Sequence, residues 1–367
     1  MSYTDALIDW LACAAAGREQ PAAQAARATG EPVLAAAAAG HVLDFDDTFL
    51  PGLAHLSAPT APVALVLGSE LGANVGEALA AYSAGFEAMG TLAAASHPVL
   101  YERGFHPTAV CGAVGAAVVA ARLLGAHERT ASALALLGAG GLRAAFGSEG
   151  KSLQVGMAAA TGLRAARLAA EGASAPPERV VSGFEEAYGA RFSWPAGESA
   201  ISENWIKAYP CCLQAHSAIE TAERAWPVDE GEPLRVTVHP ISLAAASYRE
   251  PRDGLQAKFS IPYLVAYTLL HGPPSVQSFA ALDHEALEGV TRVDVKEDGS
   301  LLESEARLEA GGRELARVEA ALGSPARPLS AAQLADKVHS LAGGDLDGAL
   351  DDPDRPVQDL LEAVRLT

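Results

Sequence analysis

The segment richest in reactive groups in this 367-residue chain is the string His41-Val-Leu-Asp44-Phe-Asp46-Asp47-Thr48, which holds three carboxylates within four residues. Its neighbours are mostly apolar, and burying such a string without partners would be strongly destabilising. One interpretation is a helix end and turn in which the aspartates cap backbone amides. The other is a site that uses the carboxylates for chemistry.

Two metal-dependent enzyme classes carry comparable aspartate strings. Residues 44–48 fit the D-x-D-x-T pattern of haloacid-dehalogenase phosphatases, in which the first aspartate is a nucleophile and Mg²⁺ lies between carboxylates. Those enzymes place the pattern after a hydrophobic strand, whereas here it follows the helix-like run 33–40, and no βαβ alternation comes after it. A terpenoid-cyclase cluster would need a second metal motif, which the sequence lacks. We therefore expect no metal.

Further residues with catalytic potential follow in order along the chain. His55 and His106 each lie near a proline, Lys151 ends the string Gly147-Ser-Glu-Gly-Lys, and Lys207 and His216 flank a Pro-Cys-Cys turn. A single histidine beside a proline is more often a turn residue than a catalyst. The two cysteines can equally be packed inside a helix start. Taken together these residues are harder to dismiss, because a small anionic substrate of an acidic protein requires locally clustered cations and imidazoles.

The first part of the chain, residues 1–204, is rich in alanine and has apolar runs of helical length interrupted by Gly and Pro. We predict that it is nearly all helix, and its many small residues suit closely packed helices in a layered bundle. The candidate helices are Thr4–Ala16, Ala61–Leu71, Gly76–Ser96, Thr108–Leu124, Glu128–Phe146 and Lys151–Ala170.

The sequence pattern changes after Ala225. Segments 234–239, 291–296 and 314–321 are predicted strands, and 257–270 is a predicted helix between the first two. A helical pattern returns near the C-terminus. The predicted fold is mostly α with a smaller α+β domain. Its parts are a large all-helical domain (1–204), an α+β lid domain (205–328) and C-terminal helices that return to the helical domain (329–367).

Composition excludes several function classes. A net charge of −19 disfavours nucleic acid and anionic membranes as partners. Asp5 and Asp9 stand where a secretory signal would be basic, which predicts a cytoplasmic protein. The apolar stretches 56–68 and 108–121 are too short to span a bilayer. The adjacent pair Cys211–Cys212 lacks the spacing of a zinc site and suits reduced thiols.

The order of six motifs along the chain is informative. They are HVLDFDDT, the His-x-Ser-Ala-Pro segment, RGFHPTA, the isolated GxxxK, KAYPCCLQAH and KFSIPYLVAYTLLHG. In this order they resemble the MmgE/PrpD family, which includes 2-methylcitrate dehydratase and cis-aconitate decarboxylase. The resemblance extends from about residue 7 to the C-terminus, and six ordered motifs are far more specific than any single pattern.

The resemblance implies a large helical domain with an α+β lid, a homodimer, and catalysis without a metal or organic cofactor. Residues of both domains are implied in one site. The expected catalytic residues are Asp44, His55, His106, Lys151 and Lys207. The expected substrate-binding residues are Thr48, Arg103, Cys212, His216 and Tyr263.

The family chemistry implies a lyase acting on a small carboxylate, most simply a dehydratase. Dehydration of a hydroxy acid requires removal of the proton beside the carboxylate and protonation of the departing hydroxide. We expect His106 to transfer the proton, with Asp44 as its partner or an alternative base. Lys151 and Lys207 would neutralise the substrate.

Several other functions stay open. Decarboxylation and epimerisation pass through a similar carbanion, although Cys212 stands where the decarboxylase branch tends to have histidine. A paralogue that binds a ligand without turnover is the alternative outside enzymes.

The chain departs from the family pattern at four positions. The family commonly has arginine where this chain has Thr91 and Leu213, and its Lys-Arg-x-His motif is replaced by a lysine followed by Ser152 and Gln154. Three cations and one titratable group are therefore absent. We expect a less cationic pocket that accepts a mono- or dicarboxylate with a larger neutral portion.

Overall fold

The computed structural model describes residues 1–194, 197, 199–229 and 231–366. The chain forms two compact units. The helical unit consists of residues 1–145, 149–206 and 329–367, and the α+β unit consists of residues 146–148 and 207–328. The sequence did not indicate that residues 146–148 belong to the second unit.

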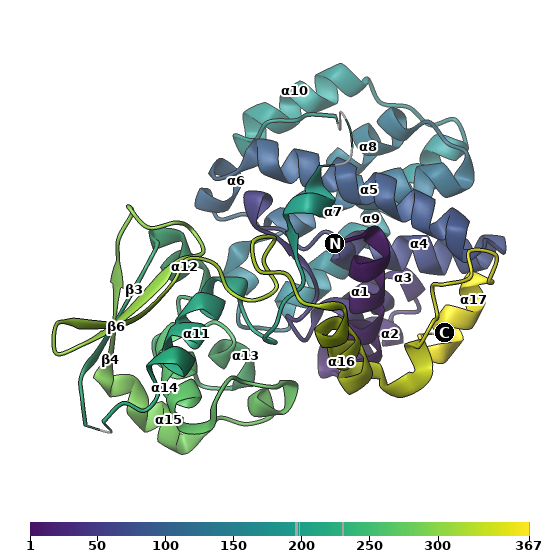
Figure 1. Cartoon of the computed structure of the whole chain (residues 1–367). Helices are drawn as coiled ribbons and strands as arrows, with labels where there is room; N and C mark the ends of the chain where they lie inside the picture. Colours follow the sequence, from purple (N-terminus) through teal and green to yellow (C-terminus); the bar gives the residue numbers. More distant parts are fainter. Residues whose placement is uncertain (195–196, 198, 230, 367) are drawn as a thin grey trace. The chain divides into compact units, whose positions relative to one another are not determined.

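The helical unit is built from the N-terminal helices and the returning C-terminus (Figure 1). Its helices are α1 (Tyr3–Gly17), α2 (Pro21–Ala28), α3 (Pro32–His41), α4 (Ser57–Leu71), α5 (Val75–Ser96), α6 (Val99–Glu102), α7 (Pro107–Leu124), α8 (Glu128–Leu136), α9 (Gly150–Ala170), α10 (Pro177–Tyr188), α16 (Ala331–Ala342) and α17 (Val357–Ala363). A short antiparallel pair joins β1 (Thr48–Phe49) to β2 (Asn204–Trp205).

Helix α7 lies at the centre of this unit and contacts α4, α5, α8 and α9. Small residues allow the close approach: a Cβ atom on Gly115 would lie 2.8 Å from Cβ of Met89, and one on Gly162 would lie 2.5 Å from the Ala113 carbonyl oxygen. Among the described helices α7 alone is long and apolar enough to cross a membrane, but 83% of its length is buried inside the protein. It is therefore a core helix of the unit.

Most of the predicted helices are confirmed, with differences at their ends. Helix α8 ends at Leu136 rather than continuing to Phe146. The reason is local, since Gly138, Gly140 and Gly141 follow within five residues, and Gly141 has φ of 137°, which side chains with a Cβ rarely adopt. The chain there forms an irregular loop that returns toward α9.

The C-terminal helices lie against the start of the chain. Helix α16 contacts α1, and α17 contacts α4. A buried ion pair anchors α16, because Nζ of Lys337 lies 2.6 Å from Oδ1 of Asp9 and donates to the Phe45 carbonyl at 2.8 Å. The same ammonium group lies 3.9 Å from the centre of the Phe45 ring. The segment 329–367 thus supports the backbone of the aspartate string.

The α+β unit contains a four-stranded sheet of order β4-β3-β5-β6. Its strands are β3 (Leu234–Val238), β4 (Val293–Glu297), β5 (Ala306–Ala310) and β6 (Arg313–Val318). Its helices are α11 (His216–Ala225), α12 (Pro240–Ala245), α13 (Gly254–Ala257), α14 (Ile261–His271) and α15 (His284–Gly289). Strand β3 is parallel to β4 and antiparallel to β5, so the β3–β4 connection crosses over through helices α12–α15.

Strand β5 was not predicted from the sequence. Its residues Ala-Arg-Leu-Glu-Ala have little intrinsic strand preference. Pairing with two neighbours determines the outcome, since Leu308 pairs with Val236 of β3 and with Ala316 of β6. The predicted helix 257–270 corresponds to α14, which begins later, at Ile261, because Pro262 favours a helix start after the Ser260 cap.

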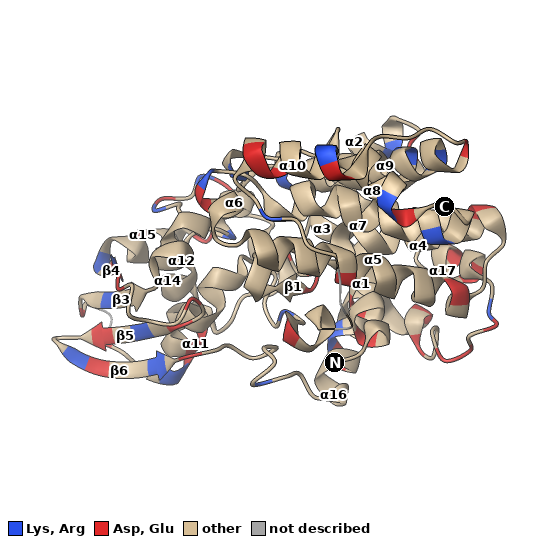
Figure 2. Cartoon of the chain, turned by 90° about the horizontal axis from the view of Figure 1, so that it is seen from above, with Lys and Arg blue, Asp and Glu red and all other residues tan. Residues whose placement is uncertain are grey.

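The distribution of charge separates core helices from exposed elements. Figure 2 shows α3 and α7 almost free of charged residues, whereas Lys, Arg, Asp and Glu all occur along the strands of the α+β unit. The buried carboxylates after α3 are therefore an exception within an apolar region, and they mark the candidate site.

Candidate active site

The site begins where α3 ends. Helix α3 approaches α1 closely, since a Cβ on Gly40 would lie 2.2 Å from Nε1 of Trp10. His41 is the last residue of the helix, and Asp44 follows with a positive φ of 53°, a conformation that aspartate tolerates better than most residues. The Asp44 N–H donates to the His41 carbonyl at 3.0 Å. The chain thus turns sharply and carries three carboxylates into the interior.

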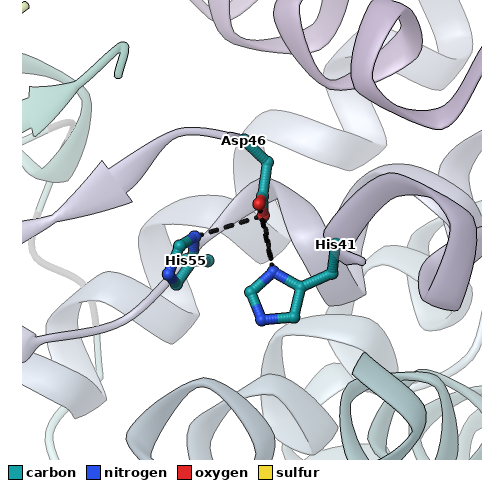
Figure 3. A group of neighbouring side chains, drawn as sticks. All are labelled: His41, Asp46 and His55. Carbon is teal, nitrogen blue, oxygen red and sulfur yellow. Dashed lines mark hydrogen bonds and ion pairs between the residues drawn. The ribbon is translucent and has the colours of Figure 1, made fainter. Parts of the chain in front are cut away.

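Asp46 lies between two imidazoles (Figure 3). Nδ1 of His41 is 2.9 Å from Oδ2 of Asp46, and Nδ1 of His55 is 3.2 Å from the same oxygen. All three side chains are buried, with Asp46 fully inaccessible to solvent. Burial alone would raise the pKa of Asp46, but the two adjoining imidazoles hold it well below its usual range. Asp46 is therefore a carboxylate that accepts an N–H from each histidine.

His55 is held as a neutral imidazole. Burial, together with the positive charge of Lys151, lowers the pKa of His55 to about 4 despite the opposing effect of Asp46. Its Nδ1 proton faces Asp46, and Thr48 Oγ1 lies 3.4 Å from the same nitrogen. Nε2 consequently carries the lone pair, 3.6 Å from Oδ1 of Asp44. This is the arrangement that prepares an imidazole as a general base.

Lys151 joins the other two members of the cluster. Its amino group donates to Oδ1 of Asp44 at 3.0 Å and to Nε2 of His41 at 2.8 Å. Burial lowers the pKa of His41, although Asp46 opposes this, so the ring is neutral with its proton on Nδ1 and its lone pair toward Lys151. Lys151 comes from the first turn of α9, about 110 residues after His41 in the chain.

The third aspartate behaves differently from the other two. Asp47 accepts a hydrogen bond from Nδ2 of Asn204 at 2.7 Å. Burial, reinforced by repulsion from Asp46, raises the pKa of Asp47 to about 8. The three aspartates therefore differ. Asp44 is a carboxylate paired with Lys151, Asp46 is a carboxylate between two histidines, and Asp47 is a carboxyl group that stays protonated near neutral pH. This division makes burial of three adjacent acids tolerable.

His106 lies beside this group. Its ring stacks at 6.2 Å from that of His41, and Nδ1 contacts Nε2 of Gln154 at 2.8 Å. Burial, followed by the charge of Lys151, lowers the pKa of His106 well below its usual value. His106 precedes Pro107 at the start of α7, so its position is set by the helix that forms the centre of the unit.

The structure brings together five of the residues that the sequence singled out. Asp44, Thr48, His55, His106 and Lys151 lie in one buried cluster of the helical unit. Arg103 lies at the surface, where its guanidinium donates to the carbonyl of Ala187 at the end of α10. Its described contact is thus outside the cluster.

The remaining four predicted residues belong to the α+β unit, and all are buried: Lys207, Cys212, His216 and Tyr263. His216 donates from Nε2 to the Cys211 carbonyl at 3.3 Å, and the Tyr263 hydroxyl accepts from the Asp283 N–H at 2.9 Å. Their participation in the same site stays a prediction.

Some members of the cluster, among them His41, Asp46 and Gln154, were not assigned a role from the sequence. His41 and Asp46 lie within the string that was singled out, and their separation of five residues across a helix end was the available signal. Gln154 was noted only as a departure from a family motif. Its partner, His106, lies 48 residues earlier, and no local pattern indicates that contact.

A metal ion is the other occupant that such residues can attract. Ligand atoms of His41, Asp46 and His55 lie within 4.8 Å of one another. However, both Nδ1 atoms already bond to Asp46, and the Lys151 amino group lies 2.8 Å from the His41 ring. A divalent cation would have to replace two protons next to a positive charge, so the donor set fits a hydrogen-bonded cluster better than a metal centre.

Comparison with known proteins identifies related sequences. Residues 27–195 match the MmgE/PrpD N-terminal domain, and residues 209–362 match the MmgE/PrpD C-terminal domain. The chain is 28% identical over 268 residues to cis-aconitate decarboxylase of Homo sapiens, covering 65% of this chain and 55% of that protein. It is 29% identical over 271 residues to cis-aconitate decarboxylase of Mus musculus, covering 65% and 54%. The chain thus spans about half the length of the curated relatives it matches.

Proposed function

Because this chain belongs to the MmgE/PrpD family over most of its length, we propose that it is a lyase that dehydrates a small hydroxy-carboxylate without a metal or organic cofactor. The observation that carries the proposal is the Asp46–His55 pair. A buried carboxylate fixes the Nδ1–H tautomer of His55, and its lone pair at Nε2 is available near neutral pH. Dehydration begins with removal of a proton beside a carboxylate, which is what such a base performs.

Residues of the helical unit can carry out both proton transfers that the dehydration requires. Nε2 of His55 takes the proton from carbon, the electron pair forms the C=C bond, and the C–O bond breaks. The departing hydroxide takes a proton from Lys151 and leaves as water. The neutral imidazoles of His41 and His106 are poorer donors, because loss of a proton would make them anions. Oδ1 of Asp44 lies 3.0 Å from Nζ of Lys151 and 3.6 Å from Nε2 of His55. It can therefore return the proton from His55 to Lys151 after the reaction.

A second candidate reaction is decarboxylation, because both relatives carry the name cis-aconitate decarboxylase. Decarboxylation leaves a carbanion that needs only a proton donor, a role that Lys151 can fill, and it makes no use of a general base. A base that is deprotonated near neutral pH therefore favours dehydration. Trapping of ¹³CO₂ from a labelled acid, without loss of water from the substrate, would instead support the decarboxylase.

The substrate is expected to be a hydroxy mono- or diacid with a larger neutral portion. Where the family motif has arginine, Ser152 is 3% exposed and bonds to the Glu149 carbonyl, so it offers the substrate no cation. A charge-assisted hydrogen bond to a carboxylate contributes roughly 1.5–3 kcal/mol, so a tricarboxylate should lose about 10- to 100-fold or more in kcat/KM.

Steady-state kinetics test this expectation. Alkyl-substituted hydroxy-diacids are compared with 2-methylcitrate, citrate and cis-aconitate, and alkene formation and solvent deuterium exchange are followed by ¹H NMR. We expect the alkyl diacids to be turned over best. Efficient dehydration of 2-methylcitrate, at about 10⁴ M⁻¹s⁻¹ or above, would contradict the proposed substrate class. Absence of exchange into every acid tested would favour the non-catalytic paralogue.

Chelation is expected to leave turnover unchanged. The His41–Asp46–His55 group is held by its own N–H donors and by Lys151, so removal of metal should not disturb it. The protein is dialysed against EDTA, its metal content is checked by mass spectrometry, and kcat is measured before and after. Loss of activity restored by Mg²⁺ would revive the phosphatase interpretation, although helix α3 stands where that class needs a strand. Restoration by Zn²⁺ would assign this group as a metal site.

A further inference from the structure

Gln154 has an amide whose orientation is fixed by the backbone of a single residue. Its Oε1 accepts from the Leu142 N–H at 2.8 Å, and its Nε2 donates to the Leu142 carbonyl at 3.2 Å. A backbone N–H can only donate and a carbonyl can only accept, so the amide cannot be turned over without losing both bonds. The nitrogen therefore faces one known direction.

That direction is toward His106. Nε2 of Gln154 lies 2.8 Å from Nδ1 of His106. An amide NH₂ group has no lone pair to offer, so Nδ1 must be the acceptor and the proton of the neutral ring must be on Nε2. The contact thus determines which of the two tautomers His106 adopts.

Backbone hydrogen bonds fix the loop around Leu142 relative to His106. The His106 N–H donates to the Gly141 carbonyl at 3.1 Å, and the Arg143 N–H donates to the Gly104 carbonyl at 2.9 Å. Phe105 and Leu142 therefore face each other as a short antiparallel bridge. The residue that orients Gln154 is thus itself paired with the residue that precedes His106.

We propose that Gln154 is a positioning residue for the lyase reaction: it fixes His106 as the Nε2–H tautomer, so that His106 donates a hydrogen bond to the substrate instead of taking its proton. The tautomer of His106 follows from the contacts of Gln154, and only its effect on catalysis rests on the proposed function. The sequence alone favoured His106 for proton transfer, and the contact with Gln154 assigns that task to His55.

The electrostatic surroundings agree with this role. The charged and titratable groups whose fields act on His106 include Lys151, His41, His55 and Asp44, and burial together with the charge of Lys151 lowers the pKa of His106. A neutral imidazole that donates from Nε2 stabilises negative charge developing on a substrate carboxylate as the enolate forms. The histidine of the family's Lys-Arg-x-His motif could donate or accept at this position, whereas the amide nitrogen of Gln154 can only donate.

The test is direct observation of the tautomer by NMR. The protein is labelled with ¹⁵N in the histidine rings, and His106 is identified as the signal lost in His106→Gln. In the unsubstituted protein we expect Nδ1 to be unprotonated and Nε2 to be protonated across neutral pH. In Gln154→Glu the carboxylate accepts from Nδ1–H, so the pattern should reverse or become that of the imidazolium. Gln154→Met removes the donor and should give a mixture of tautomers.

Two outcomes would overturn the proposal: a protonated Nδ1 in the unsubstituted protein, or an unchanged pattern in Gln154→Glu. Neither measurement requires turnover, so a failure of the proposed lyase activity remains separate from a failure of the tautomer. With an active substrate, Gln154→Glu should lower kcat by roughly 10²-fold and Gln154→Met by less. Thr161→Val on the same helix also removes one side-chain hydrogen bond, to the Met157 carbonyl, and should change neither readout.

Discussion

Replacing Asp46 with asparagine is expected to lower kcat by roughly 10³-fold while the protein stays folded. The carboxylate accepts from Nδ1 of both His41 and His55. An asparagine of the same shape can keep its oxygen toward both Nδ1 protons only by placing its NH₂ group where Oδ1 lies, 3.1 Å from Nδ1 of His41. In the other orientation the NH₂ group faces both Nδ1 protons, and the imidazoles must change their tautomers. The negative charge that stabilises His55 after it has taken the proton is also lost.

The matched control is another buried carboxylate in the same unit. Glu87 accepts from the Tyr3 hydroxyl and from the backbone N–H groups of residues 199–201, and it has no contact with the cluster among the described bonds. Glu87→Gln is expected to reduce the stability of the fold but to leave kcat per folded molecule near that of the unsubstituted enzyme. Circular dichroism and thermal melting establish the folded fraction of each variant.

A double substitution makes the assignment sharper. If Asp46 acts through His55, then Asp46→Asn combined with His55→Gln should be no slower than His55→Gln alone, because residues that act as a unit give non-additive losses. Independent losses that multiply, or a kcat close to normal in Asp46→Asn, would show that His55 is not the base.

The pH dependence of the unsubstituted enzyme gives a further check. As pH falls, kcat/KM should decrease with a midpoint near pH 4, since burial lowers the pKa of His55 to about 4.

The helical fold could be predicted because its signal is local. Runs of alanine and leucine with capping residues determine α1 and α5, where Ser2 and Asn74 form capping boxes. Strand β5 could not be predicted, since its five residues form a strand only through pairing with β3 and β6. The end of α8 was also missed, because the apolar pattern continues past Leu136 while the glycines that follow end the helix.

The site was predictable in its residue types and not in its pairings. The sequence showed that three adjacent acids must have partners if they are buried, but the partners come from distant segments. Lys151 reaches Asp44 across 107 residues, and Asn204 reaches Asp47 across 157. The sequence therefore could not show which aspartate is paired with a cation, which one orients imidazoles, and which one keeps its proton.

Replacing Asp47 with asparagine is expected to stabilise the fold, by an amount that grows with pH, at up to about 1.4 kcal/mol per pH unit between the usual carboxyl range and pH 8. The pKa of Asp47 is raised from 3.8 to about 8 by burial and by repulsion from Asp46. Below the unfolded pKa both states hold the proton, so the group has no effect on stability. As pH rises toward 8, the unfolded chain gains stability by releasing a proton that the folded protein must keep.

Asparagine resembles the protonated acid and removes this pH dependence. It can still accept from Nδ2 of Asn204, the donor that lies 2.7 Å from Asp47. Near pH 4 the variant should be within about 1 kcal/mol of the unsubstituted protein, because both then carry a neutral group at this position. The low pKa values of His41, His55 and His106 also make stability depend on pH, but they are common to both proteins and cancel in the difference.

The substitution Asp46→Asn, at the preceding residue, should have the opposite effect on the stability of the fold. The pKa of Asp46 is lowered by its histidines, so its ionised form stabilises the folded state above the usual carboxyl range, and that contribution is lost as pH falls. Urea unfolding at a series of pH values should therefore show a rising free-energy advantage for Asp47→Asn and a loss at neutral pH for Asp46→Asn. Parallel curves for Asp47→Asn and the unsubstituted protein between about pH 4 and pH 8 would mean that Asp47 is ionised in the folded state. In that case the cluster would have to hold three negative charges beside Lys151, and the division of roles among the aspartates would be wrong.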